Sequence, residues 1–494
     1  MAANMGIMKA TTIIGRTTEQ AILQEALSSG NAELIALYGR RRVGKTHLAR
    51  EFLTQNCELY FSVTGEKDAS KAIQVENFYR EMVRIFGDHI TRPKNWRTAL
   101  SDLTEELEKT PKRQKVGVFL DELPWLATHR SGFLQALDHL WNTRLSLLPN
   151  LSLVVCGSAA SWILNNLVHA KGGLYNRVTR RICLLPFSLS EAQEFLAARK
   201  VKLNRAQVAE VYLCFGGIPH YLMQIRKGQS AAQAISEACF SPNGILSDEY
   251  KHLFASLFNE NEVHSKIIEA VAKKRGGLSR NEIIKATKVS TGGRLATRLD
   301  ELEASGFLAR IETHGYTKRE PTYRIIDEYI LFYLKWIRSA PKSAFKRAGS
   351  NYWFGVQSSP AYRAWAGNSF EALCFKHIEN IQKKLGVESL VIGVGSWRYI
   401  PKKGQKESRG VQVDMLFDRS DGVIQLCEIK YSNEIFVISK DYARQLAHKL
   451  QVFEEHTKTK KQLQLVLICA HGMKRNIWSE DLVDAVVVLE DLFL

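Results

Sequence analysis

The sequence has few features that would place the protein in a membrane or in an oxidising compartment. No run of eighteen apolar residues occurs, and the N-terminus, MAANMGIMKATTI, lacks the charged-then-apolar profile of a secretory signal. The eight cysteines are scattered, with no C-x-x-C pair and no metal-ligand spacing. We therefore expect a cytoplasmic protein with reduced, mostly buried thiols and no membrane contact.

The composition is that of a globular protein with an excess of basic residues. The chain has 494 residues, of which 45% are hydrophobic, enough for packed cores in about two to four domains. Its formal net charge is +17. A charge of this size favours contact with polyanions, so DNA is an expected partner, although solubility alone accounts for part of such an excess.

One stretch, ELIALYGRRRVGKTHLAREF at residues 33–52, organises the rest of the chain. Its apolar run at 34–38 predicts a buried strand, and the residues after position 44 follow a helical pattern. Between them lies the spacing G-x-x-x-x-G-K-T, which is the phosphate-binding P-loop pattern in its expected strand-to-helix context. The alternative is a glycine-rich turn that carries a surface lysine.

Each residue of the P-loop pattern has a chemical reason. Gly39 and Gly44 allow a tight turn in which backbone N–H groups surround an anion without obstruction by a Cβ atom. Lys45 is expected to reach the β- and γ-phosphates, and the Thr46 hydroxyl to coordinate Mg²⁺. The cofactors predicted from this stretch are ATP and Mg²⁺.

The flanking segments predict further elements of an α/β domain. A helix is expected to be capped by Thr17 or Thr18 and to stop at Gly30. A strand is expected in CELYFSVTG at 57–65, and residues 70–110 are expected to be helical.

A second motif follows in KVGVFLDELPWLA. The continuous apolar run at 116–120 predicts a strand buried on both faces, and it ends in Asp121 and Glu122, where ligands bind at the carboxyl ends of parallel strands. Asp121 is expected to hold Mg²⁺, directly or through water, and Glu122 to orient and polarise the attacking water. Acidic residues after a strand also cap helices, which is the alternative.

The next buried strand, in LSLVVCGSAASWI, ends in Gly157 and Ser158. Ser158 forms a small polar tip that senses the γ-phosphate or leads into a loop. Downstream, Arg177, Arg180 and Arg181 are candidates for an arginine finger, which stabilises charge on the transferred phosphoryl group, often from a neighbouring subunit. The alternative for each arginine is a solvated basic turn.

The order and spacing of these motifs resemble a known superfamily. GRRRVGKT, FLDELPWL, CGSAASW, LYNR…ICLLPF and FGGIPHYL are similar to segments of the AAA+/STAND ATPases of archaea and bacteria, over residues 11–250. The resemblance implies a helical subdomain that closes over the nucleotide, with Pro219 of Gly217-Ile218-Pro219 at the nucleotide. It also places Gly15-Arg16 near the adenine pocket and implies a homo-oligomer.

Residues 262–325 change character. Three helical segments and two strand-like runs around a turn resemble a winged helix-turn-helix, whose third helix carries Arg294 and Arg298 on one face. These arginines are candidate DNA contacts. The alternatives are a rigid module that packs between domains and a solvated helix face.

The last portion predicts a second site. The hairpin VQVDMLF–DRSDG–VIQLCEIKYS, if paired about Asp421, places Asp414 directly opposite Glu428, and Lys430 shares their face. Mg²⁺ or Mn²⁺ bound by Asp414, Glu428 and the Ile429 carbonyl would activate a water for phosphodiester attack, while Lys430 positions it or stabilises negative charge. The alternative is an exposed hairpin with ion pairs.

The order of elements around this hairpin resembles the PD-(D/E)xK nuclease fold. Glu371, in the preceding helix, and Gln445, in the following one, match positions that assist the metal site in some members. We predict five parts: a P-loop ATPase core with a parallel sheet covered by helices on both faces, a helical lid, a winged-helix module, a linker and a restriction-endonuclease-like α/β domain. Their bounds are 1–190, 191–260, 261–338, 339–351 and 352–494.

Two functions fit these parts. The first is an ATP-binding and ATP-hydrolysing protein that controls a metal-dependent DNA nuclease, in defence, mobile-element biology or repair. The second is a nucleotide-dependent DNA-binding or regulatory switch whose nuclease-like domain does not cut.

Overall fold

The computed structural model describes most of the chain, which divides into two units with the boundary between Pro186 and Phe187 in the sequence. Each unit is described by itself. The described residues are 12–158, 160–168, 173–258, 261–274, 276–289, 293–311, 321–346, 351–401, 410–432 and 434–494. Over these ranges, no helix is long and apolar enough to cross a membrane.

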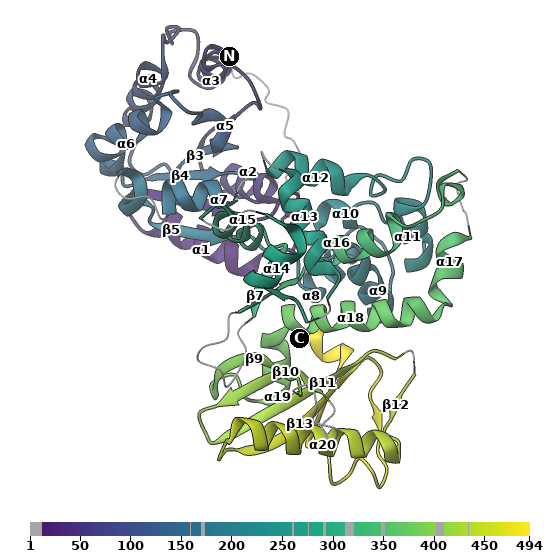
Figure 1. Cartoon of the computed structure of the whole chain (residues 1–494). Coiled ribbons are helices and arrows are strands. Elements are labelled where there is room, and N and C mark those ends of the chain that lie inside the picture. The colour runs from purple at the N-terminus through teal and green to yellow at the C-terminus, as the bar shows by residue number, and fades with distance from the viewer. Residues whose placement is uncertain are drawn as a thin grey trace. The chain divides into compact units, whose positions relative to one another are not determined.

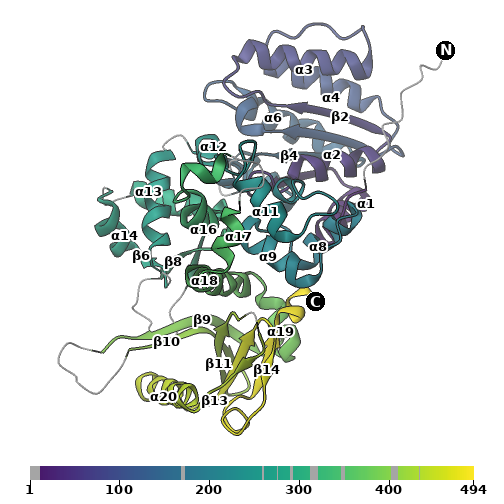
Figure 2. The same cartoon turned by 90° about the vertical axis from the view of Figure 1, so that its right-hand side faces the viewer.

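The first unit is a five-stranded parallel sheet with helices on both faces (Figure 2). The strand order is β2-β3-β4-β1-β5, and β3 and β4 are buried at every position, as their largely apolar sequences predict. The strands are β1 (Glu33–Tyr38), β2 (Leu59–Thr64), β3 (Val116–Asp121), β4 (Leu151–Cys156) and β5 (Arg180–Cys183). The main helices are α1 (Thr17–Ser28), α2 (Lys45–Asn56), α3 (Lys71–Phe86), α4 (Trp96–Glu108), α5 (Leu123–Leu126), α6 (Phe133–Thr143) and α7 (Ala160–Ile163).

The alternation of side chains along these strands decides which face carries the chemistry. Val116, Val118 and Leu120 of β3 belong to the core cluster formed with α3, α4 and α6. Since neighbouring residues of a strand point to opposite faces, Asp121 projects from the other face, on the side of α2. The P-loop helix and the acidic end of β3 therefore meet on one side of the sheet.

The predicted cap of α1 is wrong. Helix α1 begins at Thr17, its N-cap residue is Arg16 in the left-handed region with φ 58°, and no side chain caps it. The Arg16 guanidinium instead donates to the carbonyls of Leu185 and Val43, at 2.7 and 3.1 Å. Arg16 therefore joins the start of α1 to the P-loop. Thr17 lies inside the first turn of the helix.

The second unit begins with a group of helices and continues into three helices with a small antiparallel sheet of order β6-β8-β7. The turn predicted between β7 and β8 falls at 312–320, outside the described residues. The winged-helix assignment of this part stays a prediction. The elements are α8 (Leu189–Ala198), α9 (Arg205–Phe215), α10 (Pro219–Leu222), α11 (Ala231–Cys239), α12 (Glu249–Leu257), α13 (Asn261–Ala272), β6 (Leu278–Ser279), α14 (Arg280–Thr287), α15 (Gly293–Ala304), β7 (Leu308–Ile311) and β8 (Thr322–Ile325).

The segment predicted as a linker, 339–351, is described only in part, since 347–350 lie outside the described residues. Within it, Lys342–Phe345 form a 3₁₀ helix, and the Phe345 ring lies 6.1 Å from that of Phe240. The Trp353 ring stacks on the same phenylalanine, with centroids 5.7 Å apart. The contact of Phe345 attaches the segment to Phe240, the residue that follows α11, and Trp353 of α17 (Tyr352–Gln357) packs on the same ring. The domain boundaries predicted within 187–494 remain predictions.

The remaining elements build a five-stranded mixed sheet of order β15-β13-β11-β10-β9. Helix α18 lies on one face of this sheet and α20 on the other (Figure 1). The main elements are α16 (Glu328–Phe332), α17 (Tyr352–Gln357), α18 (Pro360–Lys376), α19 (Ile378–Leu385), β9 (Val391–Tyr399), β10 (Val411–Arg419), β11 (Val423–Lys430), β12 (Phe436–Val437), α20 (Lys440–Thr457), β13 (Gln462–Cys469), β14 (Met473–Lys474) and β15 (Ala485–Val488).

A buried histidine ties the start of α8 to the junction of α18 and α19. His377 Nε2 accepts the backbone N–H of Leu189 at 3.1 Å, and Nδ1–H donates to the Leu373 carbonyl at 2.9 Å. Burial lowers the pKa of His377 to about 4, although the hydrogen bond to Leu373 opposes this effect. Because one ring nitrogen must accept a hydrogen bond, the ring is neutral in the folded protein.

We expect this histidine to make the second unit less stable in acid. The pKa of His377 is 6.5 in the unfolded chain and about 4 in the folded protein. Its neutral ring therefore contributes fully to the free energy of unfolding above pH 6.5, and this contribution is lost as the pH falls toward 4. At about 1.4 kcal/mol for each pKa unit, the loss reaches about 3 kcal/mol. Denaturant unfolding at pH 7.5 and 4.5 measures it, and His377→Gln should show a smaller pH dependence than wild type. An equal dependence would contradict the assignment.

Candidate functional site

The P-loop has the backbone conformation that its glycines predict. Gly39 and Gly44 have φ values of 142° and 98°, which other residues rarely adopt. A Cβ atom on Gly39 would lie 2.2 Å from the Leu184 carbonyl oxygen, whereas one on Gly44 would meet nothing within 4 Å. Gly39 is therefore required by close packing, and Gly44 by the turn into α2, whose N-terminal N–H groups are the kind that bind an anion.

The Lys45 ammonium is buried beneath this loop. Nζ donates to the carbonyls of Gly39 and Arg40, at 3.0 and 2.9 Å. Burial lowers the pKa of Lys45, while the carboxylates of Glu122 and Asp121 oppose that effect. The cation is thus held at the loop by neutral acceptors that bound phosphate oxygens can replace.

The predicted magnesium ligands lie together. Thr46 Oγ1 donates to Asp121 Oδ2 at 2.9 Å, which links the first turn of α2 to the end of β3. A hydroxyl and a carboxylate are hard oxygen donors, and Mg²⁺ prefers such ligands while keeping several waters. The two residues therefore fit a Mg²⁺ ion bound beside the nucleotide phosphates.

Glu122 is set apart by its backbone and its partner. It has φ 48° and ψ 48°, an uncommon conformation for a residue with a side chain, and its N–H donates to Asp121 Oδ1 at 2.9 Å. Its carboxylate oxygen Oε2 accepts from both the Ser158 N–H and the Ser158 hydroxyl, at 3.1 and 2.9 Å. The strained turn thus aims Glu122 at the end of β4, on the same edge of the sheet as the P-loop.

The candidate arginine fingers lie elsewhere in the first unit. Arg177 is exposed at the end of a 3₁₀ helix, and Arg181 is exposed in β5. Arg180 pairs with Glu25 and Glu33, at 3.7 and 3.8 Å, at the amino end of β5. That end is opposite to the sheet edge that carries the P-loop, so within one chain Arg180 does not face the phosphates.

The other predicted contacts lie in the second unit. Pro219 is the first residue of α10, and a Cβ atom on Gly217 would lie 1.9 Å from the Phe187 carbonyl oxygen, which accounts for that glycine by packing. Arg294 and Arg298 lie in α15, four residues apart as predicted, and Arg298 Nη1 donates to the Arg294 carbonyl at 3.0 Å. Arg294 is exposed.

The C-terminal hairpin has the predicted register. β10 and β11 pair from Asp418–Ile424 to Met415–Cys427, which is the register expected for a hairpin centred on Asp421, and the pairing of β10 with β9 is irregular between Val413 and Leu416, next to Asp414. Asp414 Oδ2 accepts the Ile429 N–H at 3.2 Å. The side chains of Asp414 and Glu428 are both at least 94% buried, and the contact with Ile429 holds Asp414 beside the strand that carries Glu428.

Glu428 is surrounded by donors. Its Oε1 accepts from the Tyr442 hydroxyl at 2.6 Å and pairs with Lys430 Nζ at 2.9 Å, and its Oε2 pairs with Lys449 Nζ. Burial alone would raise the pKa of Glu428, but the ammonium groups of Lys449 and Lys430 hold it below its usual value. The carboxylate therefore stays ionised although it is buried.

Glu371 has a different partner. It is buried in α18, and its Oε1 accepts from Arg324 Nη1 of β8 at 3.2 Å. Throughout the described part of the chain, no group of three or more histidine, cysteine, aspartate or glutamate residues is arranged to hold a metal ion. The oxygen donors of Asp414 and Glu428 suit a hard divalent cation, but the third carboxylate predicted for it is held by an arginine.

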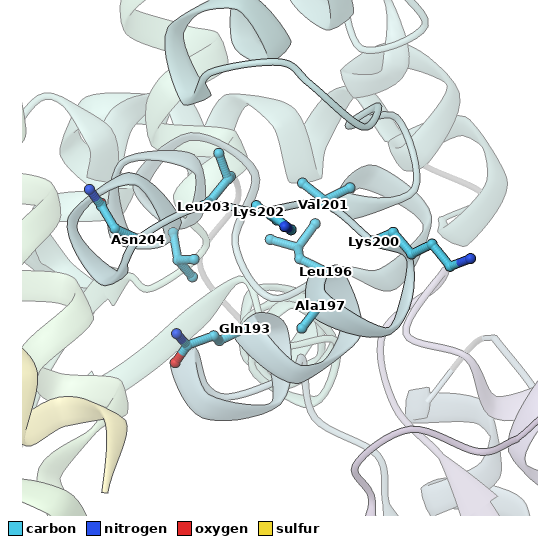
Figure 3. A pocket seen from close by; sticks show the side chains of 9 residues that line it. Gln193, Leu196, Ala197, Lys200, Val201, Lys202, Leu203 and Asn204 are labelled. Atoms are coloured by element: carbon cyan, nitrogen blue, oxygen red, sulfur yellow. The ribbon is translucent and has the colours of Figure 1, made fainter.

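A separate hollow of about 560 Å³ lies beside α8 and the loop to α9 (Figure 3). Its lining is mostly aliphatic, with lysines and an asparagine at the edge, and it includes none of the predicted site residues. The lining residues are Gln193, Leu196, Ala197, Lys200, Val201, Lys202, Leu203, Asn204 and Val208.

Sequence reasoning missed three of the groups around the second site. Tyr442 and Lys449 lie seven residues apart on α20, so both reach the same face of the helix. Gln445, the predicted assistant, lies between them and is exposed. The helical spacing could have identified Lys449, whereas Arg324 lies 47 residues before Glu371 and only the fold brings the two together.

A family model covers the residues of the first site. Residues 14–225 match a family model described as an ATPase domain predominantly from Archaea. The uncharacterized protein MJECL04 of Methanocaldococcus jannaschii is 23% identical over 430 residues, which are 85% of this chain and 88% of the relative. The Walker-type ATPase PABY2304 of Pyrococcus abyssi is similar in structure, with a TM-score of 0.49 and 19% identity, over 66% of this chain and 96% of that one. The Aeropyrum pernix ORC2 protein has a TM-score of 0.39 and 14% identity, over 73% and 93%. The family match over 14–225 and the P-loop geometry together support a P-loop ATPase domain in this part of the chain.

Proposed function

We propose that the chain binds ATP with Mg²⁺ at the P-loop and hydrolyses it with Glu122 as the residue that orients the attacking water. The observation that carries this assignment is the chain of contacts from Thr46 through Asp121 and Glu122 to Ser158 at one edge of the sheet. Lys45 would bind the phosphates, and Mg²⁺ on Thr46 and Asp121 would neutralise charge on them. Ser158 would report the γ-phosphate to Glu122 because it contacts that carboxylate directly.

We also propose that this ATPase controls a C-terminal domain that cuts DNA. The support is that Lys430 pairs with Glu428, and that Asp414 on the neighbouring strand accepts the N–H of Ile429, which lies between those two residues in the sequence. Two carboxylates with an adjacent ammonium match the chemistry of metal-assisted phosphodiester hydrolysis, in which the metal activates a water and the lysine stabilises negative charge. The cellular setting would be defence, mobile-element biology or repair.

A second function has its own support. Both oxygens of Glu428 accept from ammonium groups, and Glu371 is paired with Arg324. A site whose carboxylates are already neutralised suits a nucleotide-dependent switch that holds DNA without cutting it. Incubation of the purified protein with supercoiled plasmid, Mn²⁺ or Mg²⁺, and with or without ATP, separates the two functions. We expect nicked plasmid, and a plasmid that stays supercoiled under every condition would favour the switch.

The assembly is proposed to be a homo-oligomer in which an arginine of one copy reaches the nucleotide of the next. Arg177 suits this role because it is exposed, and Arg180 suits it less because it already pairs with two glutamates.

We expect DNA binding to weaken steeply with salt. Release of counterions from duplex DNA gives a logarithmic slope of about −0.9 for each phosphate contacted, and a formal net charge of +17 favours several such contacts. Titration of a labelled duplex at 50, 100 and 200 mM salt measures the slope. The double variant Arg294→Gln and Arg298→Gln should reduce it by about two if both contact phosphates. An affinity independent of salt would assign the charge to solubility alone.

A further inference from the structure

The second site contains a basic residue that the proposed chemistry does not use. Lys449 comes from α20, on the face of the sheet opposite to α18, and its ammonium pairs with Glu428 Oε2. The other oxygen of the same carboxylate is shared by Tyr442 and Lys430. In the described part of the chain, Lys430 of the hairpin pairs with Oε1 of Glu428, whereas Lys449 of α20 pairs with Oε2.

The charges of this cluster balance without a metal. Among the described contacts, Lys430 and Lys449 both pair with Glu428, so two positive charges stand against the carboxylates of Glu428 and the nearby Asp414. A divalent cation added to this arrangement would give an excess of two positive charges in a largely buried space, which is unfavourable. A metal can bind with reasonable affinity only if an ammonium group leaves.

The position of Lys449 allows its ammonium group to move away from Glu428. Its side chain begins on α20 rather than on the hairpin, so its ammonium group can move without any change in β10 or β11. Lys430, in contrast, is part of β11 and pairs with Glu428 from within the same strand. A phosphate group of a bound DNA strand carries the charge that would attract the Lys449 ammonium away from Glu428.

We propose that Lys449 acts as an internal cation, which occupies the metal-binding oxygen of Glu428 until a DNA phosphate draws it away, so that DNA and the divalent metal bind cooperatively. The inference rests on the proposed nuclease function, because it assumes that Asp414 and Glu428 are metal ligands. Binding of the two ligands is coupled in both directions: DNA raises the affinity for metal, and metal raises the affinity for DNA by the same factor. The device would keep the site free of metal, and hence unreactive, away from DNA.

The test measures Mn²⁺ binding rather than cutting. Mn²⁺ is titrated into the full-length protein without nucleotide, and the free ion is followed by electron paramagnetic resonance. Mn²⁺ ions that bind to wild type but not to Glu428→Gln are assigned to this site. We expect Lys449→Met to bind Mn²⁺ at least about tenfold more tightly than wild type, since a competing like charge is removed.

A matched control and a second arm complete the experiment. Arg444→Met removes one positive charge from an exposed position of the same helix, where Arg444 pairs with Asp441, and should change Mn²⁺ affinity less than about twofold. A short duplex added on ice, while it is still intact on a gel, should tighten Mn²⁺ binding to wild type about tenfold and leave Lys449→Met almost unchanged. Lys449→Gln replaces Lys449→Met if the latter loses its helical circular dichroism.

The outcomes separate the inference from the function on which it rests. Equal, measurable Mn²⁺ affinities for wild type and Lys449→Met would overturn the role of Lys449 and leave the proposed metal site standing. If Lys449→Met binds Mn²⁺ more tightly than wild type does, but DNA does not change the Mn²⁺ affinity of wild type, the release of Lys449 by a DNA phosphate would be overturned. No binding that depends on Glu428, in any variant with or without DNA, would overturn both the inference and the metal-dependent nuclease.

Discussion

Glu122→Gln is expected to bind ATP with nearly the affinity of wild type and to hydrolyse it at least about a hundredfold more slowly. The amide keeps the size of the side chain and an oxygen that accepts from Ser158, but it has no charge with which to polarise a water. Binding of a fluorescent ATP analogue and release of phosphate measure the two effects separately.

Lys45→Ala should show the complementary defect. The ammonium donates to loop carbonyls in the absence of phosphate, and its charge-assisted bonds to a nucleotide would be lost. A loss of about 2 kcal/mol corresponds to an affinity about thirtyfold lower. Glu105→Gln, at a surface-exposed position of the same unit, serves as the control and should match wild type. If Lys45→Ala binds the analogue as tightly as wild type does, the P-loop is not the nucleotide site.

The first site was predictable because its determinants are local. The glycines, Lys45 and Thr46 follow one another within eight residues, and a strand-to-helix turn fixes their geometry whatever surrounds it. Asp121 and Glu122 could be placed because the unbroken apolar run before them indicated a strand whose carboxyl end carries ligands. The contact between Glu122 and Ser158 was not predictable, since it depends on which strand lies beside β3.

The second site was only half predictable for a related reason. Hairpin register follows from the turn, so the register of β10 against β11 could be inferred from spacing alone. The groups that neutralise these carboxylates come from other elements. Lys449 depends on how α20 lies across the sheet, and Arg324 on how β8 approaches α18. Sequence patterns therefore located the acidic residues correctly but gave too little weight to the basic ones that hold them.

The same limit applies to the start of α1. Threonine is a preferred N-cap residue, and the local pattern made Thr17 or Thr18 the expected cap. The tertiary structure gives that place to Arg16, because its guanidinium reaches two carbonyl groups of distant segments. The preference of threonine for the N-cap position was outweighed by contacts with distant segments, which the neighbouring residues do not indicate.

Asp414→Asn is expected to abolish plasmid cutting while DNA binding and ATP hydrolysis continue. The amide still accepts the Ile429 N–H, so the hairpin keeps its register, but the negative charge needed to hold a divalent cation beside Glu428 is lost. DNA binding should be equal or tighter, because a negative charge near the phosphates has been removed. Glu428→Gln should behave in the same way, and Lys430→Met should lower the cutting rate more than the Mn²⁺ affinity.

The control for this series lies in the same hairpin. Asp421 is in the turn, at the end of the hairpin opposite to Met415 and Cys427, and pairs with Arg419, so Asp421→Asn removes the same charge at a distance from the site. It should cut plasmid at the wild-type rate. Supercoiled plasmid with Mn²⁺ and ATP, followed on agarose gels, gives the rates, and phosphate release from the same samples reports the ATPase. Cutting that persists in Asp414→Asn, Glu428→Gln and Lys430→Met would come from another site or from a contaminant, because each substitution removes a different part of the proposed chemistry.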